Sequence, residues 1–231
     1  MSRHIVPLLF GLIGTAILLW LGTWQMQRLE WKRGVLAEIE ERISGPFEAI
    51  PPLSVVMPDR DRYQPVALIG EIGSEEALVL VSQKRIGAGY RVISPYTLND
   101  GRRVLLDRGF IPVDQRDADR TRLGETVEVQ GNLHWPDDRN SSTPENDIAG
   151  NTWFARDIDQ MSEVLGTEPV LVIARNMSPP DPGVTPLPVD TSGIPNDHLQ
   201  YAITWFSLAF IWVVMTGTFI WRQRKGKEGT A

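Results

Sequence analysis

Residues 5–24 read IVPLLFGLIGTAILLWLGTW, twenty consecutive residues without a charged side chain. A helix rises about 1.5 Å per residue, so a run of this length matches a hydrocarbon core about 30 Å thick. A second uncharged run, YAITWFSLAFIWVVMTGTFIW, covers residues 201–221 and has tryptophans near both ends, where an interfacial belt is expected. We therefore expect two transmembrane helices, one near each end of the chain.

The first run could instead be a cleavable signal peptide. It is longer than the usual apolar core of such a peptide, and Trp24, Gln25 and Met26 stand where small residues would favour cleavage. We therefore expect an anchor that is not cleaved.

The orientation follows from the basic residues that flank the runs. Four of them follow the second run directly: Arg222, Arg224, Lys225 and Lys227. Around the first run the balance favours the opposite orientation, because Arg3 precedes it and three basic residues soon follow it. We give the second helix more weight, which predicts cytoplasmic termini and an outward-facing segment from Gln25 to His198. No Arg- and Ser-rich transit sequence precedes the first run, so we favour the periplasm and inner membrane of a bacterium over a mitochondrion.

The region between the runs predicts one mainly β domain. Helical periodicity continues over residues 25–45, as in a stalk helix, and six short segments rich in β-branched or aromatic residues follow: 66–69, 77–81, 90–96, 103–110, 126–133 and 170–175. Asn99, Asp100 and Gly101 predict a tight turn between two antiparallel strands. A short helix is expected from Asp157 to Leu165, with Asp157 as its N-cap.

The fold class that we expect is an integral membrane α+β protein, with two transmembrane helices around a mainly antiparallel, extracytoplasmic β domain. The predicted organisation is a cytoplasmic N-terminus (1–4), a first transmembrane helix (5–24), a stalk helix (25–45), a periplasmic domain (46–177), a proline-rich strap (178–198), a second transmembrane helix (199–221) and a basic cytoplasmic tail (222–231).

Composition argues against several functions. The net charge of −6 disfavours nucleic-acid binding, and the absence of cysteine excludes disulfides, thiolate metal ligands and covalent c-type haem. Three histidines, His4, His134 and His198, are too few for a multi-histidine metal cluster. The chain has no G-x-S-x-G, H-E-x-x-H, P-loop or G-x-G-x-x-G motif. Closely spaced aspartates at 117 and 119, 137 and 138, and 157 and 159 are more typical of turns than of catalytic dyads, and we do not expect an enzyme.

Two aromatic stripes meet at one membrane face, where the first helix leaves the membrane and the second enters it. Steps of four, four and three residues place a set on one side of the first helix: Trp20, Trp24, Arg28 and Trp31. His198 and Trp205 are seven residues apart, two helical turns or about 10.5 Å. A flat apolar ligand could lie between the two stripes.

Two interpretations of these stripes stay open on residue types alone. The more ordinary one is an interfacial belt, in which tryptophans anchor the helices and arginine reaches lipid phosphates. The other is a tetrapyrrole site, with His198 as axial ligand to iron, tryptophans against the macrocycle and Arg28 near the propionates.

Four phrases of the sequence resemble the Surfeit locus protein 1 family: LGTWQMQRLEWK (21–32), GYRVISP (89–95), VLLDRGFIP (104–112) and NDHLQYAITWFSLA (196–209). The resemblance covers nearly the whole chain in the right order. The resemblance implies a cytochrome oxidase assembly factor with two membrane helices around an outward-facing domain. It also implies that haem a is bound as cargo, with His198 as the ligand and Trp205 involved. Trp24 and Arg28 as contributors are our own geometric inference.

Three positions depart from the family pattern. Asp107 and Asp197 stand where asparagine is common, and Phe110 stands where tryptophan is. Asp197 could orient the His198 imidazole or cap the second helix, and we favour capping.

Our hypothesis is that haem a docks at the outer membrane interface between the two helices and passes to oxidase subunit one. The β domain would then contact the oxidase or haem a synthase. One alternative is a haem-free scaffold for oxidase subunits, which predicts normal function without His198. Another is a membrane-anchored hydrolase or transferase, which needs a catalytic set that the sequence does not offer.

Overall fold

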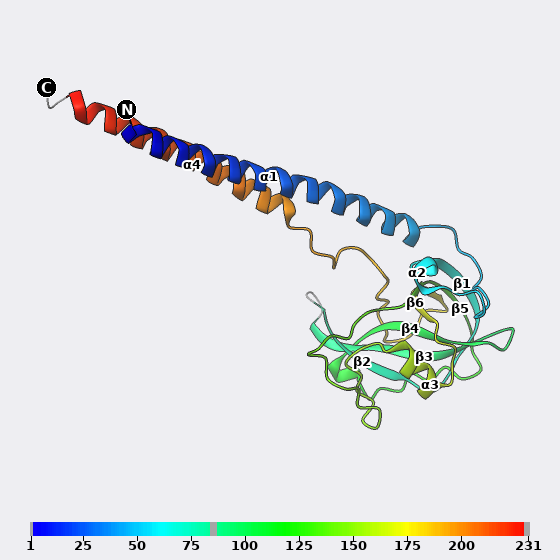
Figure 1. Ribbon diagram of the computed structural model, residues 1–231. Coiled ribbons are helices and arrows are strands. Elements are labelled where there is room, and N and C mark those ends of the chain that lie inside the picture. Colours follow the sequence, from blue (N-terminus) through cyan, green and yellow to red (C-terminus); the bar gives the residue numbers. More distant parts are fainter. Residues whose placement is uncertain (1, 84–86, 229–231) are drawn as a thin grey trace. The chain divides into compact units, whose positions relative to one another are not determined.

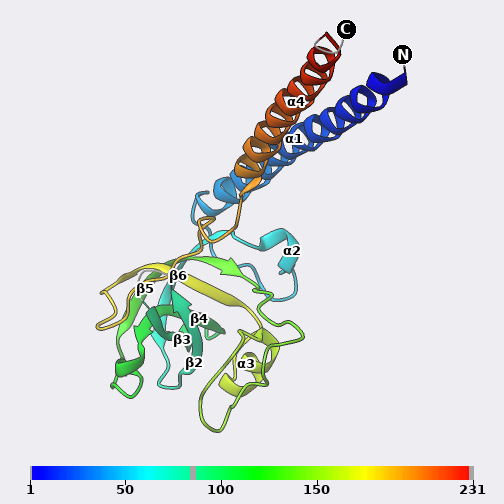
Figure 2. The ribbon, with the colours of Figure 1, turned by 90° about the vertical axis from the view of Figure 1, so that its left-hand side faces the viewer.

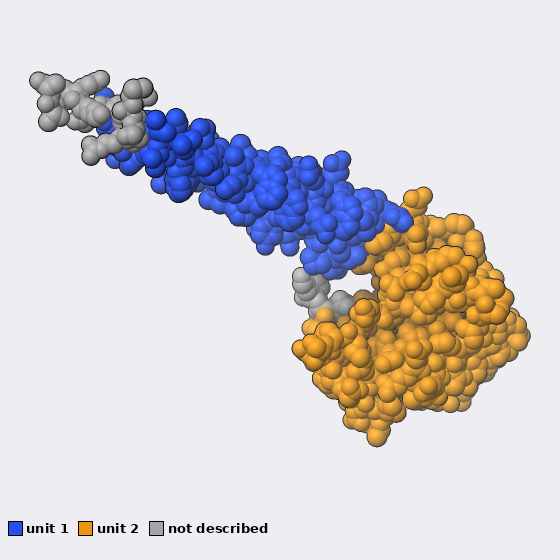
Figure 3. Space-filling view, viewed as in Figure 1, with its two compact units in different colours: residues 1–38, 191–231 blue, residues 39–190 orange. Residues whose placement is uncertain are grey.

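The computed structural model describes residues 2–83 and 87–228, shown in Figure 1. Met1 of the predicted N-terminal segment and residues 229–231 of the predicted tail lie outside the described residues. The chain divides into two compact units, residues 1–38 with 191–231 and residues 39–190 (Figure 3). The first unit is a pair of long helices and the second is a β domain.

The helix pair consists of α1 (Ser2–Ile43) and α4 (His198–Glu228). Both contain segments long and apolar enough to cross a membrane, with mean hydropathies of 2.3 and 1.8. A helix satisfies its backbone hydrogen bonds internally, as an apolar surrounding requires. Thr15 and Thr204 lie in these apolar stretches, and their hydroxyls donate to the carbonyls of Gly11 and Gln200 one turn earlier. The predicted stalk helix and the first candidate span belong to one continuous helix, α1.

The two helices lie side by side and antiparallel (Figures 1 and 2). They approach closely at three glycines of α1: Gly11, Gly14 and Gly22. A Cβ atom at Gly22 would lie 2.6 Å from the Phe206 ring, and one at Gly14 would lie 2.5 Å from the Trp212 indole. The Trp212 Nε1–H also donates to the Gly11 carbonyl at 3.1 Å. Small residues that let backbones approach are the usual basis of helix packing in lipid. We call this contact the seam.

All six predicted strands are confirmed. They are β1 (Pro65–Ile72), β2 (Ala77–Gln83), β3 (Gly87–Leu98), β4 (Arg103–Pro112), β5 (Thr126–His134) and β6 (Leu171–Ser178). The sheet order is β1-β5-β6-β4-β3-β2, and β1 also pairs with β3, so five strands close into a barrel and β2 extends it. The pairings are antiparallel except β4 with β6, which is parallel. The sequence did not predict the closure or this parallel pair.

The predicted turn and capped helix are also confirmed. Gly101 has a φ of +85° in the hairpin between β3 and β4, where a side chain would be strained. Helix α3 (Ile158–Leu165) begins after Asp157, whose carboxylate accepts from the Gln160 N–H, and ends at Gly166. Its apolar face packs on the barrel core. A one-turn helix, α2 (Pro58–Asp61), and a 3₁₀ turn (Val113–Gln115) were not predicted.

A buried arginine ties the proline-rich strap to the barrel. Arg108 on β4 is only 1% exposed, and its Nε donates to the Asp181 carboxylate of the strap at 2.6 Å. Its Nη1 donates to Glu76 at 2.7 Å. Phe110 and Thr185 exchange two backbone hydrogen bonds, of 2.7 and 2.9 Å. The first half of the strap is therefore packed on the domain and is more than a linker.

We expect Gly22→Leu to weaken the helix pair, because the new side chain would meet the Phe206 ring. Gly217→Leu is the matched control, since a Cβ atom at Gly217 has open space around it. The measurement is the thermal unfolding of the full chain in detergent. Equal stability of the two variants would contradict the described seam.

We expect Arg108→Met to destabilise the barrel by about 3–5 kcal/mol, because Asp181 and Glu76 would lose their buried partner. Arg139→Met serves as control and should cost less than about 1 kcal/mol, since its ion pairs are partly exposed. Hydrogen exchange of β4 in the full chain measures the free energy of opening. A similar loss in both variants would refute a special role for Arg108.

Candidate functional site

A polar pair lies at the end of the seam where α4 begins. The Nδ1 atom of His198 is 2.8 Å from the Oε1 atom of Gln25, and both side chains are half-buried. Gln25 follows Gly22 by three residues and precedes the buried Leu29 by four, so it continues the seam face of α1. The apolar seam thus ends in a hydrogen bond between the two helices.

The start of α4 places His198. The Asp197 carbonyl accepts from the Tyr201 N–H at 3.2 Å, so Asp197 occupies the N-cap position and His198 is the first helical residue. This is the position expected of a capping residue, and a capping role of the Asp197 carboxylate stays a prediction. Within the described part of the chain, the Nε2 atom of His198 makes no hydrogen bond.

Trp205 lies on the same face of α4 as His198. It is half-buried, and the buried Ala202 and Ala209 flank it on that face. The seam face of α4 follows heptad steps: 198, 202, 205, 209, 212 and 216. The structure therefore brings two of the four predicted site residues onto the seam.

Trp24 and Arg28 lie on a more exposed face of α1. Trp24 is 46% exposed, and the Arg28 guanidinium is 4.0 Å from the centroid of the Trp31 ring, a cation–π contact. Sequence reasoning paired this stripe with His198 and missed Gln25. The signal that could have found Gln25 is its place on the same helical face as the glycines.

An apolar groove of about 480 Å³ lies farther along the helix pair. Its lining is almost entirely apolar: Phe10, Ile13, Gly14, Ile17, Leu18, Leu208, Ile211, Trp212 and Met215. Trp20 follows Ile17 by three residues and Trp24 follows Trp20 by four, so both lie on the face of α1 that carries Phe10 and Ile17. The tryptophan stripe therefore continues the α1 side of this groove.

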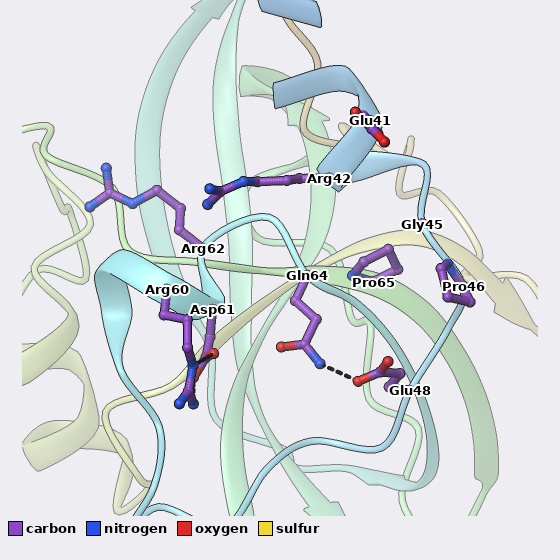
Figure 4. A pocket seen from close by; sticks show the side chains of 10 residues that line it. All are labelled: Glu41, Arg42, Gly45, Pro46, Glu48, Arg60, Asp61, Arg62, Gln64 and Pro65. Carbon is purple, nitrogen blue, oxygen red and sulfur yellow. Dashed lines mark hydrogen bonds and ion pairs between the residues drawn. The ribbon is translucent and has the colours of Figure 1, made fainter. Parts of the chain in front are cut away.

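The β domain offers a second groove, of about 410 Å³, shown in Figure 4. Two pairs of its polar groups bond to one another: the Gln64 amide donates to Glu48 at 2.8 Å, and the Arg60 Nε donates to Asp61 at 2.5 Å. The hydrogen bond from Arg60 lowers the pKa of the Asp61 carboxyl. The Nε atom of Arg62, in the same lining, is buried without a hydrogen-bond partner among the described residues. Because this lining contains no histidine, we do not place the tetrapyrrole site here.

The close carboxylate pairs have structural partners. Asp157 caps α3, and the Asp119 carboxylate accepts from the Thr121 N–H at 3.0 Å. Arg156 donates to Asp138 at 2.6 Å. Burial of Asp138 opposes ionisation, but the hydrogen bonds and positive charge of Arg156 lower its pKa. These contacts agree with the interpretation of the pairs as turn and capping residues.

His134, at the end of β5, is the histidine of the β domain. Its ring stacks on Tyr63 with centroids 5.4 Å apart, and its Nδ1 is buried without a hydrogen-bond partner among the residues that the structure describes. Burial, followed by the positive charges of Arg156 and Arg62, lowers the pKa of His134 to about 4. The imidazole is therefore neutral at neutral pH and has a packing role.

This low pKa predicts an acid-sensitive β domain. In the unfolded chain the histidine pKa is near 6.5, so between pH 6.5 and pH 4 the unfolded chain binds a proton that the folded domain does not. His134 therefore has little effect on the free energy of unfolding above pH 6.5 and lowers it as the pH falls toward 4. We expect a loss of about 2 kcal/mol between pH 7 and pH 5. Hydrogen exchange of β5 in the full chain measures it, with His134→Phe as comparison. An unchanged pH slope in the variant would contradict this account.

Comparisons with known proteins place the chain in a family. The SURF1 family model matches residues 12–210. Surfeit locus protein 1 of Xenopus tropicalis is 29% identical over 226 residues, covering 88% of this chain and 71% of the relative. A SURF1-like protein of Monosiga brevicollis is 30% identical, covering 89% and 83% of the two chains. One from the bacterium Rickettsia bellii is 27% identical, covering 88% and 86%. Because the family model matches most of its length, this chain belongs to the SURF1 family.

Proposed function

We propose that the protein is a membrane-anchored assembly factor that carries haem a, bound through His198, to subunit one of a haem-copper oxidase. Membership of the SURF1 family implies a role in cytochrome oxidase assembly. The cargo, its ligand and its recipient are the steps that we add.

The observation that carries the proposal is the environment of His198. One ring nitrogen is bonded to Gln25, while the other has no hydrogen-bond partner in the described part of the chain. A neutral imidazole with one free nitrogen is a common axial ligand of haem iron. The donor set therefore fits haem, and a single protein ligand suits a carrier that must release its cargo.

The other proposed residues would hold the macrocycle. Trp205 lies two turns along α4 on the face of His198, where its indole would contact an apolar ring. Trp24 and Arg28 lie on the exposed face of α1, and Arg28 would pair with a propionate. Close packing at Gly22 and Phe206 fills the seam there, so we propose that haem lies beside the helix pair.

The antiparallel pair of candidate spans also supports a topology. If both helices cross the membrane, both termini lie on one side, and the segment between the helices, which contains the β domain, lies on the other. The basic residues after α4 favour a cytoplasmic side for the termini, and the Rickettsia relative supports a bacterial inner membrane. We propose that the periplasmic β domain contacts subunit one, and that haem a synthase is a further partner.

The test is to express the full chain in cells that make haem a and purify it in mild detergent. We expect a near-stoichiometric haem a spectrum and pyridine haemochrome from the wild type, and only background from His198→Ala. His134→Phe is the matched control and should keep the pigment, because His134 packs inside the β domain.

Two results would contradict the proposal in different ways. Full pigment in His198→Ala would exclude His198 as the ligand. Folded wild-type protein that co-purifies with oxidase subunits but carries no haem would refute the carrier function and favour the haem-free scaffold.

A further inference from the structure

We propose that Gln25 is a positioning residue for His198: it keeps the imidazole proton on Nδ1 and so leaves Nε2 free to bind iron. This inference rests on the proposed function, because it assigns a role to the neighbour of the proposed ligand. It adds a residue of α1 to a site that sequence reasoning assigned to His198 and an aromatic stripe.

The hydrogen bond determines which ring nitrogen of His198 carries the proton. The Oε1 atom of Gln25 lies 2.8 Å from Nδ1, and an amide oxygen can only accept. Nδ1 must therefore donate. A neutral imidazole carries one ring proton, so Nε2 keeps its lone pair.

The position of the pair makes this control effective. Gln25 is half-buried at the end of an uncharged run of twenty residues, so water competes weakly for Nδ1. Packing along α1 fixes the amide, because Gly22 meets Phe206 one turn before it and Leu29 is buried one turn after it. The packing along the seam thus holds Gln25 in the position that this hydrogen bond requires.

The bond also affects how well His198 binds iron. The two ring nitrogens point in widely different directions, so an imidazole that turns Nδ1 toward Gln25 turns Nε2 away from it. An acceptor on the second nitrogen fixes the ring orientation and raises the basicity of a histidine ligand. Gln25 would therefore both aim and strengthen the proposed iron bond.

A simpler role for Gln25 is to join the helices. Polar side chains commonly link membrane helices through hydrogen bonds. In that case Gln25→Leu would weaken the contact between α1 and α4 and leave the tautomer of His198 unchanged. The experiment must separate these two roles.

The first measurement uses the haem-free full chain in detergent, with ¹⁵N-labelled histidine. The chain has three histidines, so the His198 signals are assigned by their loss in His198→Ala. We expect a proton on Nδ1 in the wild type and loss of this preference in Gln25→Leu. Gln25→Glu should keep it, because a carboxylate also accepts. Gln27→Leu, on an exposed face of α1, is the matched control and should not change it.

The second measurement is the affinity for haem a. Gln25→Leu should bind it about 10- to 100-fold more weakly, the usual effect of removing the partner of a metal-binding histidine. Gln25→Glu and Gln27→Leu should bind it as tightly as the wild type or nearly so.

The outcomes distinguish this inference from the function on which it rests. Haem binding that requires His198 but is the same in Gln25→Leu, with an unchanged tautomer, would overturn the role of Gln25 alone. Equal weakening in Gln25→Leu and Gln25→Glu would also overturn it, because the carboxylate of Gln25→Glu still accepts from Nδ1. Wild-type protein without haem would overturn the proposed function and the iron bond together, and the labelled histidine would still show whether Gln25 controls Nδ1.

Discussion

The close approach of α1 and α4 at three glycines determines how the helix pair is built. Two apolar helices that lie in lipid gain no hydrophobic drive toward each other, so in a membrane this pair would be held by close contact and hydrogen bonding. Gly11 meets Thr216, Gly14 meets Trp212 and Gly22 meets Phe206, in one antiparallel register. Continued by one turn, the register leads from Gly22 to Gln25 on α1 and from Phe206 to Ala202 on α4, one turn from His198. A packing constraint in the apolar part thus fixes a polar contact at its end.

The β domain is stabilised by a different balance of forces. It is a closed barrel with an apolar core, and closure leaves few unpaired strand edges. Its buried charges are paired: Arg108 with Asp181, and Asp107 with Arg91 at 2.5 Å. The negative charge of Asp107, which the sequence analysis singled out, is matched by that arginine. Such pairs cost much to break, because one partner alone would leave a buried charge.

The sequence predicted the features that depend on neighbouring residues. Each strand, the turn at Asn99–Gly101 and the cap at Asp157 follow from local patterns, and the structure confirms them. The parallel pairing of β4 with β6 and the closure of β1 on β3 depend on segments far apart, and no local pattern specifies them.

The same limit explains the candidate site. Helical periodicity correctly grouped Trp20, Trp24 and Arg28 on one face, but it could not say which face meets α4. The sequence did not predict Gln25 as a site residue because its partner, His198, is 173 residues away in the chain. Only the register of the seam brings the two together.

That long separation has a consequence for biosynthesis. At about 5–20 residues per second, a ribosome needs roughly 10 to 35 s to pass from Gln25 to His198. During this time α1 is already made, whereas its partner helix does not exist. The Gln25–His198 contact can form only after the whole β domain has been translated. A nascent or truncated chain therefore lacks the contact, and only molecules that have completed α4 can have it.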